Sequence, residues 1–441
     1  MNRRRIRIRL IAILTGVVMA LLALAGCGVL PGSSQTSAVE EKVTLTFRHF
    51  WVGEHDKPVE RIFRQVIDEF EAEHPWIKID FEGLDQTIHR EQKLKSEMVT
   101  GRPPDIFSLF GGAEIEPYVR AGRLLDLTGF IEERGMKDQF SDLSLWTFDG
   151  KVYGLPFEGN AEPLFYNKTM FERFGLSPPR TVDELMELIP ALKRQRIIPF
   201  ALGNEAQWPA GIYAHYLMDR QVGSKRFESV LKGEASFDNP DYLLALESLY
   251  EMAGLGAFPA NPNLIDTEEA VDLFTEGKAA MYVNGNWDIT LFPQHFMDDV
   301  GVIPFPVIRP GDPQALAGGY TVGIGLSSAL NESKQEAALA FLAEMYRPDV
   351  QRRLMNEAYR IPAMSGLADM QTAGPVFSQV IRLTEQTEAK FVPYDNMLPP
   401  EVKQKFLHIV ADIVDRRLQP DEGLKKLEQA AQNYWRLRSS R

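Results

Sequence analysis

The chain has 441 residues, of which 44% are hydrophobic, so it can form large buried cores and more than one domain, at roughly 100–200 residues each. Its formal net charge is −13, and we expect such an acidic chain to bind neither nucleic acid nor an anionic lipid surface through its own charge. The single cysteine excludes an intramolecular disulfide, and the seven histidines are scattered along the chain. We therefore expect no metal and no cofactor.

The first 26 residues have the pattern of a signal peptide. Five arginines and no acid lie among the first nine residues, and a largely apolar run over 10–23 follows, too short for a comfortable bilayer span. The next segment, LAGC at 24–27, resembles the lipobox of bacterial lipoproteins. The resemblance implies cleavage before Cys27 and lipidation of Cys27. The mature chain, with a net charge near −18, would then be anchored to the cell membrane by its N-terminal lipid, on the extracytoplasmic side.

Residues 27–41 are rich in Ser, Gly, Pro and Thr, which predicts a flexible tether. After the tether, alternating apolar residues predict strands at 43–47, 77–81 and 106–110. Apolar residues at helical spacing predict a helix that opens at Asp56 and Pro58, and a charged stretch predicts a second helix over 87–100. Strands that alternate with helices favour a parallel sheet covered by helices.

A second region begins near Val152. Its predicted strands are at 164–166, 197–202, 279–283 and 322–326. Its predicted helices include 182–194 with Thr181 as the N-cap, 268–277, one that starts near Ser333, and two amphipathic helices at the C-terminal end. The chain shows no internal repeat.

Several short segments resemble one known family. They are RPPDIF at 102–107, GRLLDL at 122–127, KVYGLP at 151–156, LFYNK at 164–168, GKAAMYVNGNW at 277–287 and GGY at 318–320. Each segment alone is a weak signal. Their order and spacing, behind a lipobox, resemble the carbohydrate-binding lipoproteins of bacterial ABC importers, the extracellular solute-binding proteins related to maltose-binding protein.

This resemblance implies an α/β, two-lobed, periplasmic-binding-protein-like (type II) fold with hinge crossings and a central ligand cleft. It places lobe 1 at 42–155 and 323–368. It places lobe 2 at 156–322, with a C-terminal helical part at 369–441. It also implies a monomer that closes around a carbohydrate ligand and delivers it to separate ABC transporter permease subunits. Clefts between domains are favoured ligand sites, which agrees with this arrangement.

A sugar site needs aromatic platforms for the ring faces and amides or carboxylates for the hydroxyls. The candidate ligand-binding residues follow predicted strands or stand at predicted crossings; they are Trp51, Asp85, Gln86, Phe110, Gly111, Glu114, Glu158, Asn160, Trp208, Asn286, Trp287, Asp288, Gly319, Tyr320 and Arg360. Trp287 is the main predicted platform, because it follows a strand through an Asn-Gly-Asn turn. Trp51 and Trp208 suit lobe packing equally well, and the acidic candidates also suit helix caps or surface charges.

Two other functions compete with this one. An anchored extracellular glycosidase would need only two suitably spaced carboxylates, but neither a nucleophile elbow nor a His-Glu-x-x-His motif is present. A binding protein for a polyol or a glycerophosphodiester is the other alternative. A phosphate ligand would need several basic residues, and Arg360 is the only basic candidate. We therefore expect a non-enzymatic protein, without catalytic residues, that binds a neutral oligosaccharide.

Overall fold

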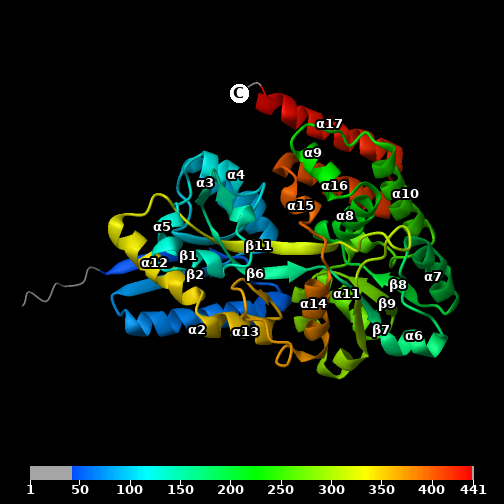
Figure 1. Cartoon of the computed structure of the whole chain (residues 1–441), viewed down its shortest axis with the longest axis horizontal. Helices are drawn as coiled ribbons and strands as arrows, with labels where there is room; N and C mark the ends of the chain where they lie inside the picture. Colours follow the sequence, from blue (N-terminus) through cyan, green and yellow to red (C-terminus); the bar gives the residue numbers. More distant parts are fainter. Residues whose placement is uncertain (1–41, 440–441) are drawn as a thin grey trace, which may run out of the picture. The chain divides into compact units, whose positions relative to one another are not determined.

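The computed structural model of the chain describes residues 42–439 (Figure 1). The predicted signal peptide at 1–26, the predicted lipidation site Cys27 and the predicted tether at 27–41 lie outside these residues. Within residues 42–439, no helix combines the length and the apolar character needed to cross a membrane.

A seven-stranded sheet organises the first lobe. Its strands are β1 (Val43–His49), β2 (Ile77–Gly83), β3 (Ile106–Phe110), β6 (Leu155–Ala161), β11 (Leu316–Leu326), β12 (Ile361–Pro362) and β13 (Lys390–Phe391). The order is β12-β6-β11-β3-β1-β2, and β13 pairs with β11. β1 is parallel to β2 and β3, as the alternation of strands and helices predicts, whereas β11 is antiparallel to β3 and β6.

Helices cover this sheet, and a small hairpin of β4 (Thr147–Phe148) and β5 (Lys151–Val152) accompanies it. The helices are α2 (Lys57–Glu73), α3 (Lys95–Thr100), α4 (Glu116–Arg120), α5 (Thr128–Glu133), α12 (Glu332–Met345) and α13 (Pro348–Ala358). α2 buries the apolar face predicted from its spacing and carries Pro58 in its first turn. The stretch predicted as one helix at 87–100 begins with a π-helical segment, η2 (Ile88–Leu94), which buries His89 with its Nε2 2.7 Å from the Ser108 carbonyl oxygen.

A four-stranded sheet organises the second lobe. Its strands β7 (Leu164–Asn167), β8 (Ile198–Ala201), β9 (Ala279–Val283) and β10 (Val300–Ile303) lie in the order β10-β7-β9-β8. The helices of this lobe are α6 (Lys168–Phe174), α7 (Val182–Arg194), α8 (Trp208–Val222), α9 (Ser224–Leu231), α10 (Pro240–Gly254), α11 (Thr267–Thr275), α14 (Gly374–Gln386), α15 (Tyr394–Met397), α16 (Pro400–Val414) and α17 (Pro420–Ser439). Thr181 caps α7 as predicted, because its hydroxyl accepts the Glu184 N–H at 3.2 Å.

The buried apolar side chains follow the two sheets. One cluster, around the seven-stranded sheet, takes its residues from 45–157 and 322–364. Two further clusters, around the four-stranded sheet, draw mainly on 161–317 and 373–431. The predicted α/β class and the predicted two lobes are thus confirmed. Lobe boundaries at 155/156, 322/323 and 368/369 remain a proposal, which the distribution of the buried clusters supports.

Two long strands connect the lobes. β6 and β11 run side by side from one half of the ribbon to the other (Figure 1). β11 pairs with β13 at its start, at Leu316 and Ala317, and with β3 at its end, from Val322 to Leu326. Between these two stretches its register with β6 is irregular. Gly318 there has φ +150°, and a Cβ on Gly318 would lie 2.3 Å from the Asn160 carbonyl oxygen, so only glycine allows β6 and β11 to approach this closely.

Candidate functional site

A cavity of about 270 Å³ lies between the two lobes. Phe50, Asp85 and Phe110 line it just beyond or at the carboxyl ends of β1, β2 and β3, the edge where open α/β sheets bind ligands. Trp208 and Trp287 line it from the second lobe, and Glu158 and Asn160 line it from the connecting strand β6. The cavity therefore has walls from both lobes and from the crossing between them.

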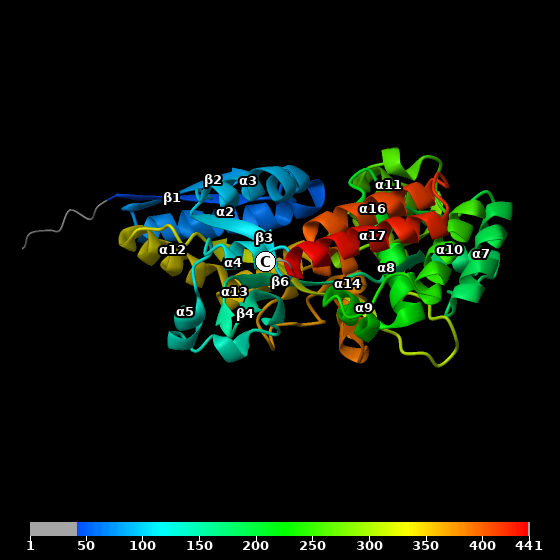
Figure 2. The ribbon, with the colours of Figure 1, turned by 90° about the horizontal axis from the view of Figure 1, so that it is seen from above.

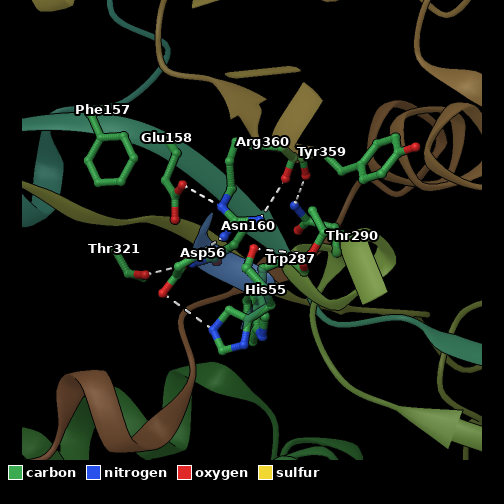
Figure 3. A network of polar contacts seen from close by, with 12 residues as sticks. His55, Asp56, Phe157, Glu158, Asn160, Trp287, Thr290, Thr321, Tyr359 and Arg360 are labelled. Carbon is green, nitrogen blue, oxygen red and sulfur yellow. Dashed lines mark hydrogen bonds and ion pairs between the residues drawn. The ribbon is translucent and has the colours of Figure 1, made fainter. Parts of the chain in front are cut away.

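Arg360 holds the centre of a polar network behind this wall (Figure 3). Its Nη2 donates to Asp56 Oδ1 at 2.6 Å, its Nη1 donates to the Ala358 carbonyl oxygen at 2.7 Å, and its Nε lies 2.7 Å from Glu158 Oε2. The guanidinium is 1% exposed. Each nitrogen thus faces an acceptor, and a buried cation is tolerated here because two carboxylates neutralise it.

The titration of Glu158 reflects its burial. Burial raises the pKa of Glu158 to about 7, because the ionised carboxylate loses its hydration inside the protein. The charge of Arg360 opposes this shift. Asp56, the second carboxylate on Arg360, contributes to the rise. Asp56 and Glu158 share Arg360, but only Asp56 also contacts His55. Glu158 therefore takes up a proton more readily than Asp56.

His55 joins the two lobes through acids on both sides. Its Nε2 is 3.4 Å from Asp56 Oδ2 in the first lobe, and its Nδ1 is 3.7 Å from Asp288 Oδ1 in the second. Burial alone would lower the pKa of His55, but the charges of Asp56 and Asp288 raise it to about 9. His55 is therefore an imidazolium at neutral pH, and it links the lobes electrostatically.

Asp288 sits deeper than the cavity wall. It is 0% exposed, and Tyr282 donates its hydroxyl to Asp288 Oδ2 at 2.6 Å. Burial raises the pKa of Asp288 to about 6, against the opposite effect of His55. Asp288 thus positions His55 and Tyr282.

Two tryptophans form the aromatic wall of the second lobe. Trp208 begins α8, and Trp287 lies in the short helix η6 (Asn286–Leu291). Their ring centroids are 5.9 Å apart with planes inclined by 60°. Both rings remain partly exposed to the cavity. Gly285 allows this position, because a Cβ there would lie 2.1 Å from the Trp287 ring.

The first lobe supplies a second aromatic wall. Phe50 and Phe110 stack with centroids 5.4 Å apart, and the Arg90 guanidinium lies 3.5 Å from the Phe110 ring centroid. Arg90 is also paired with Glu114 at 2.5 Å. Burial would raise the pKa of Glu114, but Arg90 and Lys403 lower it to about 2. Arg90 is thereby fixed over Phe110, with its charge neutralised.

Helices of the second lobe also reach the first lobe directly. Lys403 in α16 pairs with Glu91 at 2.6 Å and lies 3.5 Å from Glu114. Near the C-terminal end, Arg438 in α17 pairs with Glu116 in α4 at 2.8 Å. Figure 2 shows α16 and α17 running together over the second lobe toward the first. These ion pairs require the lobes to be close together.

The structure brings eight of the fifteen predicted ligand-binding residues to the cavity. They are Asp85, Gln86, Phe110, Glu158, Asn160, Trp208, Trp287 and Arg360. Asp85 is exposed and also accepts the Ile88 N–H at 3.0 Å, whereas Asn160 is buried and donates to Thr321 Oγ1 at 2.8 Å. Asn160 Oδ1 is buried and accepts no hydrogen bond from any of the described residues.

The other seven predicted residues lie away from the cavity wall. Trp51 is 1% exposed and stacks on Phe63 at 4.7 Å, so its ring packs inside the lobe. Glu114 and Asp288 orient Arg90 and His55. Asn286 is 0% exposed; its Oδ1 accepts the Ala161 N–H at 2.7 Å and its Nδ2 donates to the Tyr359 carbonyl oxygen at 2.5 Å.

Gly111, Gly319 and Tyr320 belong to the strand crossings. Gly111 donates its N–H to the Thr321 carbonyl oxygen at 2.9 Å, and Trp146 Nε1 donates to the Tyr320 carbonyl oxygen at 2.8 Å. Gly319 stands opposite Asn160 in the irregular stretch of β11. These contacts hold β11 in place rather than face the cavity.

Sequence reasoning did not find several residues of the wall, namely Phe50, His55, Asp56, Arg90, Glu162, Glu205, Asp266, Glu268, Asp395 and Asn396. Phe50 is adjacent to the predicted platform Trp51, and strand alternation past the end of β1 does not say which of the two rings turns toward the cavity. Asp56 was interpreted as a helix start. Asp395 and Asn396 follow no predicted strand, so no local pattern marks them.

Comparison with known proteins gives concordant matches. The family model described as bacterial extracellular solute-binding protein matches residues 56–352, more than half of the chain. A solved structure described as a chitin oligosaccharide binding protein is 31% identical, with a TM-score of 0.85, and the match covers 89% of this chain and 98% of that one.

Two curated relatives match over much of their length. The melibiose/raffinose/stachyose-binding protein MelE of Bacillus subtilis is 26% identical over 80% of this chain and 80% of its own. The multiple sugar-binding protein of Streptococcus mutans is 24% identical over 71% of this chain and 72% of its own.

Proposed function

Because the chain belongs to the bacterial extracellular solute-binding protein family, we propose that it captures an oligosaccharide in the cavity between its lobes and delivers it to an ABC transporter permease. This is a family of binding proteins that act outside the cytoplasm. The names of the matched relatives support the ligand class, since they bind melibiose, raffinose and stachyose, multiple sugars, or chitin oligosaccharides.

The observation that carries this proposal is the pair of partly exposed tryptophans, Trp208 and Trp287, on one wall of a polar cavity. An aromatic face covers the C–H face of a sugar ring, while the rim hydroxyls need acceptors and donors around it. Two rings inclined by 60° offer surfaces to two differently tilted sugar rings, which favours an oligosaccharide over a single sugar.

We assign the polar contacts to residues at the cavity rim. Asp85 and Gln86 from the first lobe and Asn160 from β6 would bind hydroxyls. Arg360 and Glu158 would act through the network that fixes the wall, because Arg360 already faces an acceptor at each nitrogen. A ligand held from both lobes favours the closed state by its differential affinity for that state.

The lipid anchor at Cys27, the monomeric state and the absence of a catalytic step belong to the same proposal. The signal peptide and the LAGC segment support the anchor. An anchored binding protein stays near its permease, and the acyl chain contributes about 0.8 kcal/mol for each buried CH₂.

A panel of oligosaccharides added to the purified mature chain tests the function. We expect a thermal shift and a calorimetric binding signal with at least one oligosaccharide, with no change in the sugar recovered. Formation of a shorter sugar would indicate a glycosidase. A panel of oligosaccharides without any binding would contradict the proposal.

A further inference from the structure

The cavity between the lobes carries an excess of negative charge. Eight acidic side chains line it, against two arginines and one histidine. Both arginines are already neutralised, Arg360 by Asp56 and Glu158, and Arg90 by Glu114. No positive charge from arginine or lysine is therefore left for an anionic ligand in this cavity.

Five of the lining carboxylates make no ion pair with any residue in 42–439. They are Asp85 in the first lobe, and Glu205, Asp266, Glu268 and Asp395 in the second. Asp85 and Asp266 each accept a backbone N–H at a helix start, which leaves their charge in place. Glu205, Glu268 and Asp395 make no side-chain hydrogen bond within the described part of the chain. An acidic protein has many solvated acids, but here they surround one cavity whose cations are already paired.

Buried groups of the wall also lack partners. Asn160 is 8% exposed, and its Oδ1 has no donor among the described residues although its Nδ2 is bonded to Thr321. Asn396, also 8% exposed, has an Nδ2 without an acceptor in the same range. A ligand that both donates and accepts hydrogen bonds would satisfy these two amides. A sugar does so, and an amine on the sugar adds donors where the unpaired acids lie.

We propose that the captured oligosaccharide carries free amines, so that the cavity prefers glucosamine-type sugars over their N-acetylated or hydroxyl counterparts. This inference rests on the proposed carbohydrate-binding function. An ammonium brings a positive charge and three donors into a cavity whose unpaired charges are negative. The sequence predicts a neutral ligand only because Arg360 is the single basic residue among the candidate ligand-binding residues. The clustering of unpaired acids at one cavity is visible only in the structure.

Three trimers with the same β-1,4-linked glucose backbone test the proposal: the glucosamine trimer, the N-acetylglucosamine trimer and cellotriose. Calorimetry on the purified mature chain is run at slightly acidic pH, where the amines are protonated. It is repeated at ionic strengths of roughly 0.01 M and 0.15 M, where the Debye length is about 30 Å and 8 Å. We expect the glucosamine trimer to bind about tenfold more tightly than the other two at low salt, and to lose most of this advantage at high salt.

A matched pair of variants locates the charges responsible. The triple variant Glu205→Gln, Glu268→Gln and Asp395→Asn removes three unpaired carboxylates of the cavity. The control Glu133→Gln, Glu187→Gln and Glu247→Gln removes three exposed, unpaired carboxylates elsewhere, with the same change in net charge. We expect the first variant to lose the preference for amines and to keep its affinity for the neutral trimers. The control should behave like the parent.

The outcomes separate the two proposals. If cellotriose or the acetylated trimer binds as tightly as the amine, or more tightly, the amine preference is wrong while carbohydrate binding stands. If no oligosaccharide of any kind binds, the proposed function itself fails. If the cavity variant does not fold, the salt dependence of binding to the parent protein still tests the amine preference. Only a charged ligand should bind with an affinity that depends strongly on salt.

Discussion

Thr290 in the second lobe donates its hydroxyl to the carbonyl oxygen of His55 in the first lobe, at 3.1 Å. The same hydroxyl lies 2.9 Å from the Trp287 carbonyl oxygen, so one side chain ties the aromatic wall to the opposite lobe (Figure 3). This contact, like the His55–Asp288 contact beside it, exists only while the lobes are together. Trp287 therefore lies both at a contact between the two lobes and at the wall of the proposed ligand cavity.

Replacing Trp287 by alanine is expected to weaken oligosaccharide binding by at least about thirtyfold, because truncation of a central aromatic anchor typically costs 2 kcal/mol or more. The melting temperature should change little, since the ring is partly exposed. Calorimetry with the best oligosaccharide from the panel measures the effect. Trp76→Ala, which removes a half-buried ring outside the cavity, is the control and should bind like the parent. Parental affinity in Trp287→Ala would show that another surface holds the sugar.

The protonation of His55 predicts how stability depends on pH. A pKa raised from 6.5 to about 9 contributes stability that is fully present below pH 6.5 and is lost as the pH rises through 9. We expect the free energy of unfolding to fall across this window by about 3 kcal/mol from His55, since each pKa unit corresponds to about 1.4 kcal/mol. Urea denaturation at several pH values measures the slope.

The variant His55→Gln should have a shallower slope over the same window. His295→Gln removes an exposed histidine and should retain the parental slope. If His55→Gln keeps the full slope, then His55 is not the group that titrates.

Loss of Arg360 is expected to destabilise the fold more than loss of an exposed arginine. Arg360→Ala leaves Asp56 and Glu158 buried without their cation, and breaking a buried pair on one side typically costs about 3–5 kcal/mol. Arg61→Ala, which removes an exposed arginine paired with Glu357 at 3.0 Å, should cost about 1 kcal/mol or less. Chemical denaturation compares the two variants. Equal effects would mean that the Arg360 network contributes no more than a surface pair.

The two hinge glycines should differ in their tolerance of a side chain. Both have φ in the left-handed range, +150° at Gly318 and +134° at Gly319, so alanine is strained at both. Only at Gly318 would the Cβ also meet backbone, 2.3 Å from the Asn160 carbonyl oxygen, whereas at Gly319 the nearest atom is 3.8 Å away. We expect Gly318→Ala to lower the melting temperature further than Gly319→Ala does. Similar losses in both would remove the close approach as the reason for glycine at 318.

Lipidation at Cys27 predicts a change of fractionation. Cys27→Ala should leave the protein unprocessed or released into the medium, because the acyl group is the proposed anchor. Immunoblots of membrane and soluble fractions, with metabolic labelling by a fatty acid, measure this. Cys27 is the only cysteine, so any label lost in the variant came from this position. Normal maturation with membrane retention in Cys27→Ala would contradict the proposed anchor.

Much of the fold could be predicted from local patterns. The α7 bounds and its Thr181 cap were predicted residue for residue, since both the apolar period and the cap are local signals. The full extent of β11 could not be predicted in this way. The predicted strand at 322–326 covers only the part of β11 that pairs with β3. The first half of β11 contains Gly318 and Gly319, and two consecutive glycines locally favour a turn. This segment forms a strand because β6 and β13 pair with it.

The candidate site was predictable only where a residue follows a strand that ends at the cavity. Trp287 and Asp85 do, and their position could be read from the chain. The choice between Phe50 and Trp51 depends on which ring turns toward Phe63 in α2, a tertiary contact that no spacing reveals. The network of His55, Asp56 and Arg360 joins residues about 300 positions apart, and only the folded chain shows that they meet.

β11 also determines when the chain can fold. The seven-stranded sheet begins with residue 43, yet it needs the strand at 316–326 between β3 and β6, and the edge strand at 361–362. The first lobe therefore cannot complete its hydrogen-bonded ladder before β11 is available, whereas the strands of the second lobe all lie within 164–303. Pairings so distant in sequence make folding slow, because the loop entropy is lost before the contacts form. A chain that becomes available from its N-terminus onward thus leaves the sheet of the first lobe incomplete until residues 316–326 can pair.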